Sequence, residues 1–186
     1  MTRLNSTGQA RALTRDEIQR LHECASPRDR AILWTCLGGG LRIGETCRLL
    51  VGQLGSDWGV TIDRHSAKGK KTRKVFISLE ARPYIQAWVG TRGLCREGDY
   101  LYPSRKGGYV EHGSQLVEQL MMRAGVRGAS SHSLRRTHAQ ALRAQHADLE
   151  VIKAQMGHSS IAVTERYLSQ YPLNHQAHVE RLVLLG

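Results

Sequence analysis

Apolar residues recur at helical spacing over most of the chain. Thr14, followed three positions later by Glu17, has the pattern of a capping box at the start of a first helix. A second apolar stretch begins at Pro27, a residue suited to the first turn of a helix. It stops at the three glycines 38–40, where the backbone is free to leave the helix. A third helix is predicted directly afterwards, over residues 41–50.

The pattern changes after residue 52. Two short β-prone runs, 60–62 and 74–77, flank a basic turn at 67–73, which predicts an antiparallel hairpin with a cationic tip. Helical spacing returns over 81–91, and a short segment at 100–102 precedes a loop. Beyond residue 112 the chain is predicted to be helical over 113–124, 132–146, 149–156, 160–169 and 174–185. The predicted fold class is therefore mainly α with a small antiparallel β-hairpin or sheet (α+β).

Length and composition favour one folded domain. A chain of 186 residues can bury its own core, and 40% hydrophobic residues exclude disorder throughout. Residues 1–12 are polar and basic and are interpreted as a loose N-terminal segment, with a single domain over 13–186. The sequence has no apolar run of membrane-spanning length and no hydrophobic leader, so we expect no membrane partner. Four isolated cysteines without a CxxC pair fit a reduced, cytoplasmic compartment.

The charge balance is strongly basic. Lysine and arginine number 27 against 16 acidic residues, a formal net charge of +11. Such a field attracts polyanions, nucleic acids above all. A ribosome-associated or merely soluble basic domain would carry the same surplus, so charge alone does not identify the partner.

Several arginine and lysine side chains occur at positions where the fold alone does not require a positive charge. Arg42 follows the triple glycine and begins a helix, where a positive charge is mildly unfavourable. It must find an anion, either a bound ligand or a nearby carboxylate such as Glu45. The hairpin tip gathers four more cations: Lys68, Lys70, Lys71 and Arg73. A basic turn of this kind is usually only solvated, but it can also reach a phosphate backbone.

The segment 131–138 is denser in basic residues. His132 and Arg135 are three apart and share a helix face, so they could hold one anion together. Arg135 and His138 have the same spacing, but His138 falls on the apolar stripe and is predicted to be a buried structural histidine. His158 lies in a short connection, where a capping role is the alternative. Tyr167 has a spacing that is more often found in a core than in a catalytic site.

The sequence lacks the motifs of several other reaction classes. It has no HExxH, no zinc-finger spacing, no serine nucleophile elbow and no P-loop. We therefore expect neither a metal nor another cofactor.

Five stretches together resemble the catalytic domain of the tyrosine recombinase (phage integrase) family, whose fold is similar to that of type IB topoisomerases. They occur in the family's order: GLRIGE at 40–45, KGKKTRKV at 68–75, HSLRRTHA at 132–139, MGHSS at 156–160 and TERY at 164–167. Any one of them is weak evidence. All five in order, across nearly the whole chain, are highly specific.

The resemblance assigns roles by position. It implies a catalytic set made of Arg42, Lys68, His132, Arg135, His158 and Tyr167. Tyr167 would be the nucleophile and Lys68 the general acid. The two arginines would hold the phosphate, His158 would donate to it, and His132 would act as general base or proton relay. Glu45 matches a position that supports the site, and Lys70, Lys71, Arg73 and Arg136 would contact DNA.

The resemblance also implies partners. The substrate would be double-stranded DNA, cut and rejoined through a 3′-phosphotyrosyl bond by a homo-tetramer on DNA, with a monomer in its absence. Most members carry an N-terminal DNA-binding domain, whereas here the catalytic domain begins near Leu13, a layout similar to that of the small fimbrial-switch invertases. Fewer phosphate contacts mean weaker binding, so an accessory DNA-binding protein is a further expected partner. The segment 174–185 would dock on a neighbouring protomer or on its own domain.

Three other functions stay open at this point. A type IB topoisomerase-like enzyme would use the same cleavage without exchange between two sites. A DNA-binding regulator would keep the fold without cleaving. A metal-independent ribonuclease would use histidine and lysine but would not need Tyr167.

Overall fold

The computed structural model describes residues 10–63, 72–93, 95–158 and 163–164. The first helix, α1 (Arg15–Cys24), begins at the predicted capping box. The Thr14 hydroxyl accepts from the backbone N–H of Glu17 at 3.2 Å, and the Glu17 carboxylate accepts from the backbone N–H of Thr14 at 2.9 Å. Two helix-end donors are thereby satisfied.

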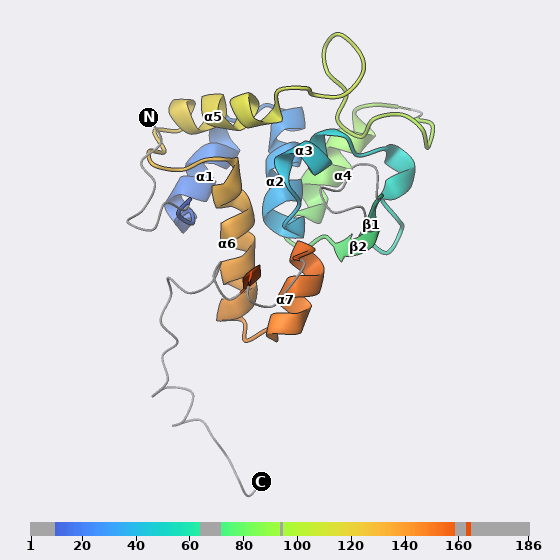
Figure 1. Ribbon diagram of the computed structural model, residues 1–186. Helices are drawn as coiled ribbons and strands as arrows, with labels where there is room; N and C mark the ends of the chain where they lie inside the picture. Colours follow the sequence, from blue (N-terminus) through green and yellow to red (C-terminus); the bar gives the residue numbers. More distant parts are fainter. Residues whose placement is uncertain (1–9, 64–71, 94, 159–162, 165–186) are drawn as a thin grey trace, which may run out of the picture.

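Helix α2 (Pro27–Gly39) forms the centre of the molecule (Figure 1). All of its residues from Ala31 to Gly39 are buried, which explains why its sequence is apolar on every side. It packs against α4 (Arg82–Gly90) and α6 (Ser131–Ala144). It ends as predicted at the glycines, with Gly40 in the left-handed region at φ +65°. A Cβ at Gly40 would lie 2.5 Å from the His138 ring, so this position also requires a glycine for space.

The third helix is shorter than the sequence predicts. Helix α3 (Ile43–Cys47) is followed by a 3₁₀ turn, η1 (Val51–Gln53), so the expected helix over 41–50 is wrong at its C-terminal end. The Leu49 carbonyl accepts a hydrogen bond from the backbone N–H of Leu101 at 2.7 Å, and Leu50 forms a β-bridge with Tyr100. This pairing with a distant segment takes the backbone groups that a longer helix would have used.

The predicted hairpin is present. Strands β1 (Gly59–Ile62) and β2 (Arg73–Phe76) pair antiparallel, with Val60 opposite Val75 and both side chains buried. The tip lies outside the described residues, and Lys68, Lys70 and Lys71 lie there with it. A mainly helical chain with a two-stranded antiparallel sheet confirms the predicted fold class.

Three helices complete the described part: α5 (Gly113–Arg123), α6 and α7 (Leu149–Met156). Figure 1 shows α6 and α7 side by side, with the hairpin against α7. Gln155 makes this last contact: its amide donates to the carbonyls of Phe76 and Gly39 and accepts from the Phe76 N–H. The ends of α2, β2 and α7 are thus held together. The predicted helices at 160–169 and 174–185 lie outside the described residues, except for 163–164.

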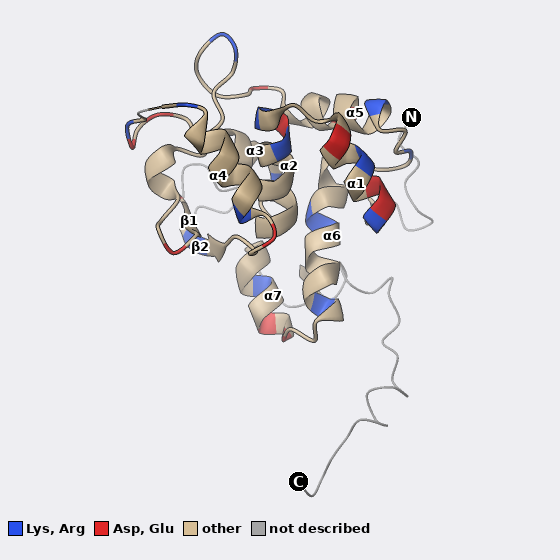
Figure 2. Cartoon of the chain, turned by 180° about the vertical axis from the view of Figure 1, so that it is seen from behind, with Lys and Arg blue, Asp and Glu red and all other residues tan. Residues whose placement is uncertain are grey.

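No helix in the described part is both long and apolar enough to cross a membrane. Viewed from behind, α6 carries arginines and no acidic residue, whereas α1 carries both signs (Figure 2).

Candidate anion-binding site

Glu45 is a buried carboxylate held by two arginines. Only 4% of its surface is exposed. Its Oε1 accepts from Arg42 Nη1 at 3.0 Å, and its Oε2 accepts from the backbone N–H of Arg42 at 2.9 Å and from Arg73 Nη2 at 2.7 Å. Burial alone would raise the pKa of Glu45, but the hydrogen bond and charge of Arg73, together with those of Arg42, hold it below its usual value of 4.5. The carboxylate is therefore ionised at neutral pH.

Arg42 pairs with Glu45, the nearby carboxylate that the sequence offered as its partner, and the Arg42 side chain is still 37% exposed. A guanidinium has five N–H donors, and the side-chain bond to Glu45 uses one of them. Pairing with Glu45 and holding a ligand are therefore compatible for this residue. The two alternatives drawn from the sequence do not exclude one another.

Arg135 is oriented by two backbone carbonyls. It is 4% exposed and donates through Nη1 to Gly40 and through Nη2 to Met156. These carbonyls belong to the glycine turn after α2 and to the last residue of α7. A side chain on α6 thus joins the two segments that lead to Arg42 and to His158.

His158 follows the glycine that ends α7. Gly157 adopts φ +61°, and a Cβ there would lie 2.5 Å from Arg73 Cδ, so the turn is packed directly on Arg73. Burial, and then the charges of Arg135, Arg42 and Arg73, lower the pKa of His158 to about 4. Its Nδ1 lies 3.0 Å from the Oγ1 of Thr164. The imidazole is thus neutral at physiological pH, and the positive charges of all three arginines act on it.

Four segments that are distant in the sequence therefore bring three guanidinium groups and a neutral imidazole together. Arg42 comes from the start of α3, Arg73 from β2, Arg135 from α6 and His158 from the end of α7. We call these four residues with Glu45 the basic cluster. The cluster holds three guanidinium groups and one carboxylate, which pairs with Arg42 and Arg73, so its net charge is positive. Planar N–H donors arranged in this way suit the oxygens of a phosphate group.

The two histidines of the 131–138 segment have different surroundings. His138 is buried, and its Nδ1–H donates to the Leu37 carbonyl at 2.7 Å, which confirms it as a structural residue. Burial lowers the pKa of His138 to about 4. His132 is exposed, one turn before Arg135 on the same helix. Its position allows the predicted role, which stays a prediction.

Two cations predicted to contact DNA have other partners. Arg73 pairs with Glu45, and its side chain is 14% exposed. Arg136 is 1% exposed, and its Nη1 donates to the Ala10 carbonyl at 2.7 Å. This guanidinium therefore has a partner within the fold, and the DNA contact of Arg136 stays a prediction. Tyr167 and Lys68 lie outside the described residues.

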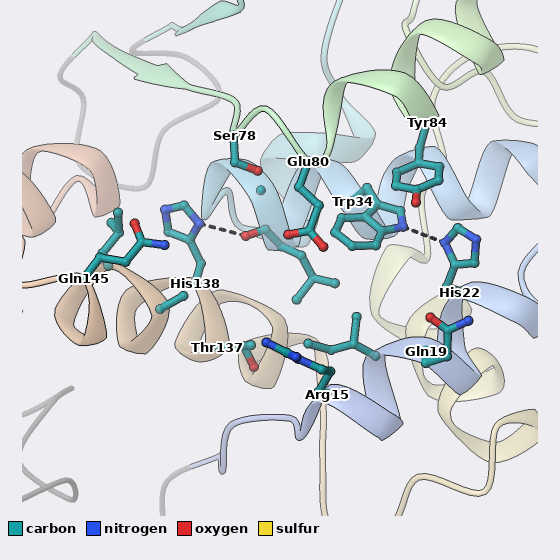
Figure 3. A pocket seen from close by; sticks show the side chains of 15 residues that line it. Arg15, Gln19, His22, Trp34, Ser78, Glu80, Tyr84, Thr137, His138 and Gln145 are labelled. Carbon is teal, nitrogen blue, oxygen red and sulfur yellow. Dashed lines mark hydrogen bonds between the residues drawn. The ribbon is translucent and has the colours of Figure 1, made fainter.

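A separate hollow of about 660 Å³ lies between α1, α2, α4 and α6 (Figure 3). Trp34 stacks on Tyr84 with ring centroids 4.7 Å apart, and its Nε1–H donates to His22 Nδ1 at 2.8 Å. His138 lines one end, and the basic cluster is not part of the lining. Within the described residues, no three His, Cys, Asp or Glu side chains are grouped so that they could hold a metal ion.

Comparison with known proteins identifies the class. The sequence profile described as "Phage integrase family" matches residues 11–173. The chain therefore belongs to the phage integrase family, and the matched region is a tyrosine recombinase catalytic domain. The resemblance read from the five motifs is confirmed.

Individual relatives agree with this assignment. The chain is similar to the tyrosine recombinase XerD of Chlamydia trachomatis serovar D, with 32% identity over 81% of this chain and 51% of the relative. It is also similar to the tyrosine recombinase XerA of Thermococcus kodakarensis, with 31% identity over 84% of this chain and 57% of the relative. The chain thus spans about half the length of these curated relatives.

Solved structures share the fold. A crystal structure of XerA recombinase superposes with a TM-score of 0.75 and 27% identity, covering 91% of this chain and 62% of that one. The XerH site-specific recombinase bound to its difH substrate, in a pre-cleavage complex, superposes with a TM-score of 0.68 and 21% identity, covering 95% and 55%. The XerH match shows the fold alone, and the XerH structure was solved as a complex with DNA.

Proposed function

We propose that this chain is a site-specific DNA recombinase that cuts and rejoins DNA through a 3′-phosphotyrosyl intermediate at Tyr167. The observation that carries the proposal is the basic cluster. Arg42, Arg135 and His158 converge there from three distant segments, and family membership supplies the reaction class. The partner is double-stranded DNA, bound by a homo-tetramer with or without an accessory DNA-binding protein.

The proposed reaction is a transesterification in which bonds and protons balance. The Tyr167 oxygen attacks the scissile phosphorus and forms a phosphotyrosyl bond, while the bond to the 5′-oxygen breaks. The phenol has an ordinary pKa of about 10 and must lose its proton, which His132 accepts or relays. Lys68 gives a proton to the departing 5′-oxygen. Reversal with another 5′-hydroxyl rejoins the strand, and no ATP is consumed.

The described residues support the electrostatic part of this proposed mechanism. Negative charge grows on the non-bridging oxygens in the transition state, and fixed N–H donors stabilise it best when they do not have to reorganise. Two backbone carbonyls fix Arg135, and a buried carboxylate fixes Arg42. Both guanidinium groups are therefore oriented before DNA arrives.

The experiment that tests the proposal is SDS trapping of a covalent protein–DNA adduct. The probe is supercoiled DNA carrying the sequence that flanks the gene, incubated with the wild type and with Tyr167→Phe. We expect an adduct with the wild type and none with the variant, because phenylalanine lacks the attacking oxygen. A two-site product assay then separates recombination from topoisomerase-like relaxation.

Two results would contradict the proposal. An adduct of equal yield with Tyr167→Phe would exclude this tyrosine as the nucleophile. Retained DNA binding without any adduct from the wild type would indicate a non-cleaving DNA-binding protein.

The hairpin lysines offer a second test. We expect Lys68→Ala to slow adduct formation by about 100-fold or more, since general acid catalysis contributes about 10²- to 10⁴-fold. Lys70→Ala and Lys71→Ala should lower DNA affinity instead, most clearly at low salt, and each should reduce the salt dependence of binding, since each removes one phosphate contact. Single-turnover trapping and a salt titration of DNA binding separate the two effects. Equal losses in all three variants would show that these lysines only bind the backbone.

A further inference from the structure

His158 has a polar neighbour that the motif roles leave unexplained. Thr164 is fully buried, with 0% of its surface exposed. Its Oγ1 lies 3.0 Å from Nδ1 of His158, a hydrogen-bond distance between two side chains six residues apart. A buried hydroxyl without a partner is unfavourable, and this imidazole nitrogen supplies one for Thr164.

The hydrogen bond bears on where the imidazole proton sits. A neutral imidazole carries its single proton on one nitrogen, and a hydrogen bond to the other nitrogen selects the tautomer. His158 is neutral at physiological pH because it is half-buried and lies near Arg42, Arg73 and Arg135. If the Thr164 hydroxyl donates to Nδ1, the proton is on Nε2. If Nδ1–H donates to Thr164, Nε2 carries a lone pair instead.

A phosphodiester group distinguishes these two arrangements. Its non-bridging oxygens accept hydrogen bonds and donate none, so an Nε2 lone pair facing them would be repelled. Only the tautomer with Nε2–H can donate to the phosphate. The ring nitrogen bonded to Thr164 is Nδ1, which leaves Nε2 on the other side of the ring.

We propose that Thr164 is a positioning residue whose hydroxyl donates to Nδ1 of His158, keeps the ring proton on Nε2 and orients that N–H toward the scissile phosphate. This inference rests on the proposed function for its purpose, but the tautomer it assigns is a property of the protein alone. It gives a chemical role to the first residue of the TERY motif, three positions before Tyr167. Thr164 therefore links the histidine to the segment that holds the nucleophile.

The role requires a hydroxyl and not merely a side chain of this volume. Valine has the same shape as threonine but cannot donate, and serine donates but lacks the methyl group. Thr164→Val therefore removes the proposed interaction while it preserves the packing, and Thr164→Ser does the reverse. A residue that only filled space would give the opposite ranking.

The first measurement is ¹⁵N NMR of the histidine-labelled full chain above neutral pH, with the His158 signals assigned by their loss in His158→Gln. We expect the Nε2–H tautomer in the wild type and in Thr164→Ser. In Thr164→Val we expect a mixture of tautomers. Predominant Nδ1–H in the wild type would overturn the proposal. This test uses the wild type alone, so it does not depend on whether a variant folds.

The second measurement is the single-turnover rate of adduct formation on supercoiled DNA. We expect Thr164→Val to be slower by about 10- to 100-fold, by analogy with the loss of a partner that orients a metal-binding imidazole. DNA affinity should stay unchanged, and Thr164→Ser should restore the rate to within a few-fold. A Val variant as fast as the wild type, or a Ser variant as slow as Val, would contradict the positioning role.

The two proposals fail separately. A wild type with the Nε2–H tautomer that is lost in Thr164→Val, but with no adduct, would overturn the recombinase function and support the assignment of Thr164. A wild type that forms the adduct with an Nδ1–H tautomer would do the reverse.

Discussion

Replacing Arg135 with lysine should slow covalent-adduct formation by several hundred-fold, although the charge is retained. The guanidinium donates to the carbonyls of Gly40 and Met156 from two different nitrogens. A lysine ammonium donates from one atom and cannot reach both carbonyls and a phosphate at once. Loss of one preorganised donor to a developing oxyanion reduces the rate by about 10²- to 10³-fold. Single-turnover trapping on supercoiled DNA measures this loss.

The same substitution should also destabilise the fold. Arg135 is 4% exposed, so the carbonyls that it leaves are shielded from water. An unsatisfied buried acceptor costs about 1–3 kcal/mol, and urea unfolding would detect that change in the free energy of unfolding. Arg143→Lys is the matched control, since Arg143 is only partly buried and lies two turns further along α6. An Arg135→Lys variant that cleaves at nearly the rate of Arg143→Lys would exclude Arg135 from the phosphate site.

The sequence predicts those features that depend on neighbours along the chain. The capping box at Thr14, the stop at Gly40 and the β-hairpin each follow from residues within one turn or one strand of each other. The end of α3 was not predictable in this way. It depends on Leu49 pairing with Leu101, about fifty residues later, and no local propensity records such a contact.

The candidate site shows the same division. The motif order indicated Arg42, Arg135 and Glu45, and the fold brings Arg42 to Glu45. The motif order did not indicate Arg73 as the second partner of Glu45, because Arg73 lies in the hairpin and Glu45 lies in α3. It also could not separate Arg136 from Arg135. Adjacent helical residues point about 100° apart, and only the fold shows that Arg135 meets the carbonyls of Gly40 and Met156 whereas Arg136 meets that of Ala10.

The proposed function requires that the charges of the basic cluster are held in place before DNA binds. Without Glu45, Arg42 and Arg73 would face each other and Arg135 with no anion between them. With Glu45, two of the guanidinium groups are anchored and the net charge stays positive. In the proposed reaction, DNA phosphate would add to a preformed cluster, which is the condition under which electrostatic stabilisation of a transition state is most effective.

Replacing Glu45 with glutamine should therefore cost stability and activity together. Glutamine has the same shape but no charge, and removing one partner of a buried ion pair costs about 3–5 kcal/mol. Arg42 is partly exposed, so we expect the lower end of that range for the free energy of unfolding at neutral pH. Adduct formation should fall by at least about 10-fold, because Arg42 loses the group that orients it. Urea unfolding and single-turnover trapping measure the two effects.

The pH dependence of this difference has a definite sign. The folded pKa of Glu45 lies below its usual value of 4.5, so the folded state binds fewer protons than the unfolded chain does as the pH falls past that value. The stability that Glu45 contributes is fully present above pH 4.5 and is lost as the pH falls through its folded pKa. The wild type and Glu45→Gln should therefore converge in stability on acidification. A constant difference across that window would show that the carboxylate acts through shape and not through charge.

Asp57→Asn is the control for this prediction. Asp57 pairs with Lys74 at 2.7 Å, the same separation as that between Glu45 and Arg73. Both partners of that pair are about half exposed, where water and salt screen the interaction, so we expect no measurable change in stability. Two ion pairs of equal length should thus differ widely in effect, because only the one at Glu45 is buried. Equal effects from the two substitutions would mean that burial does not set the contribution of Glu45, and that its link to the arginines is weaker than the contacts indicate.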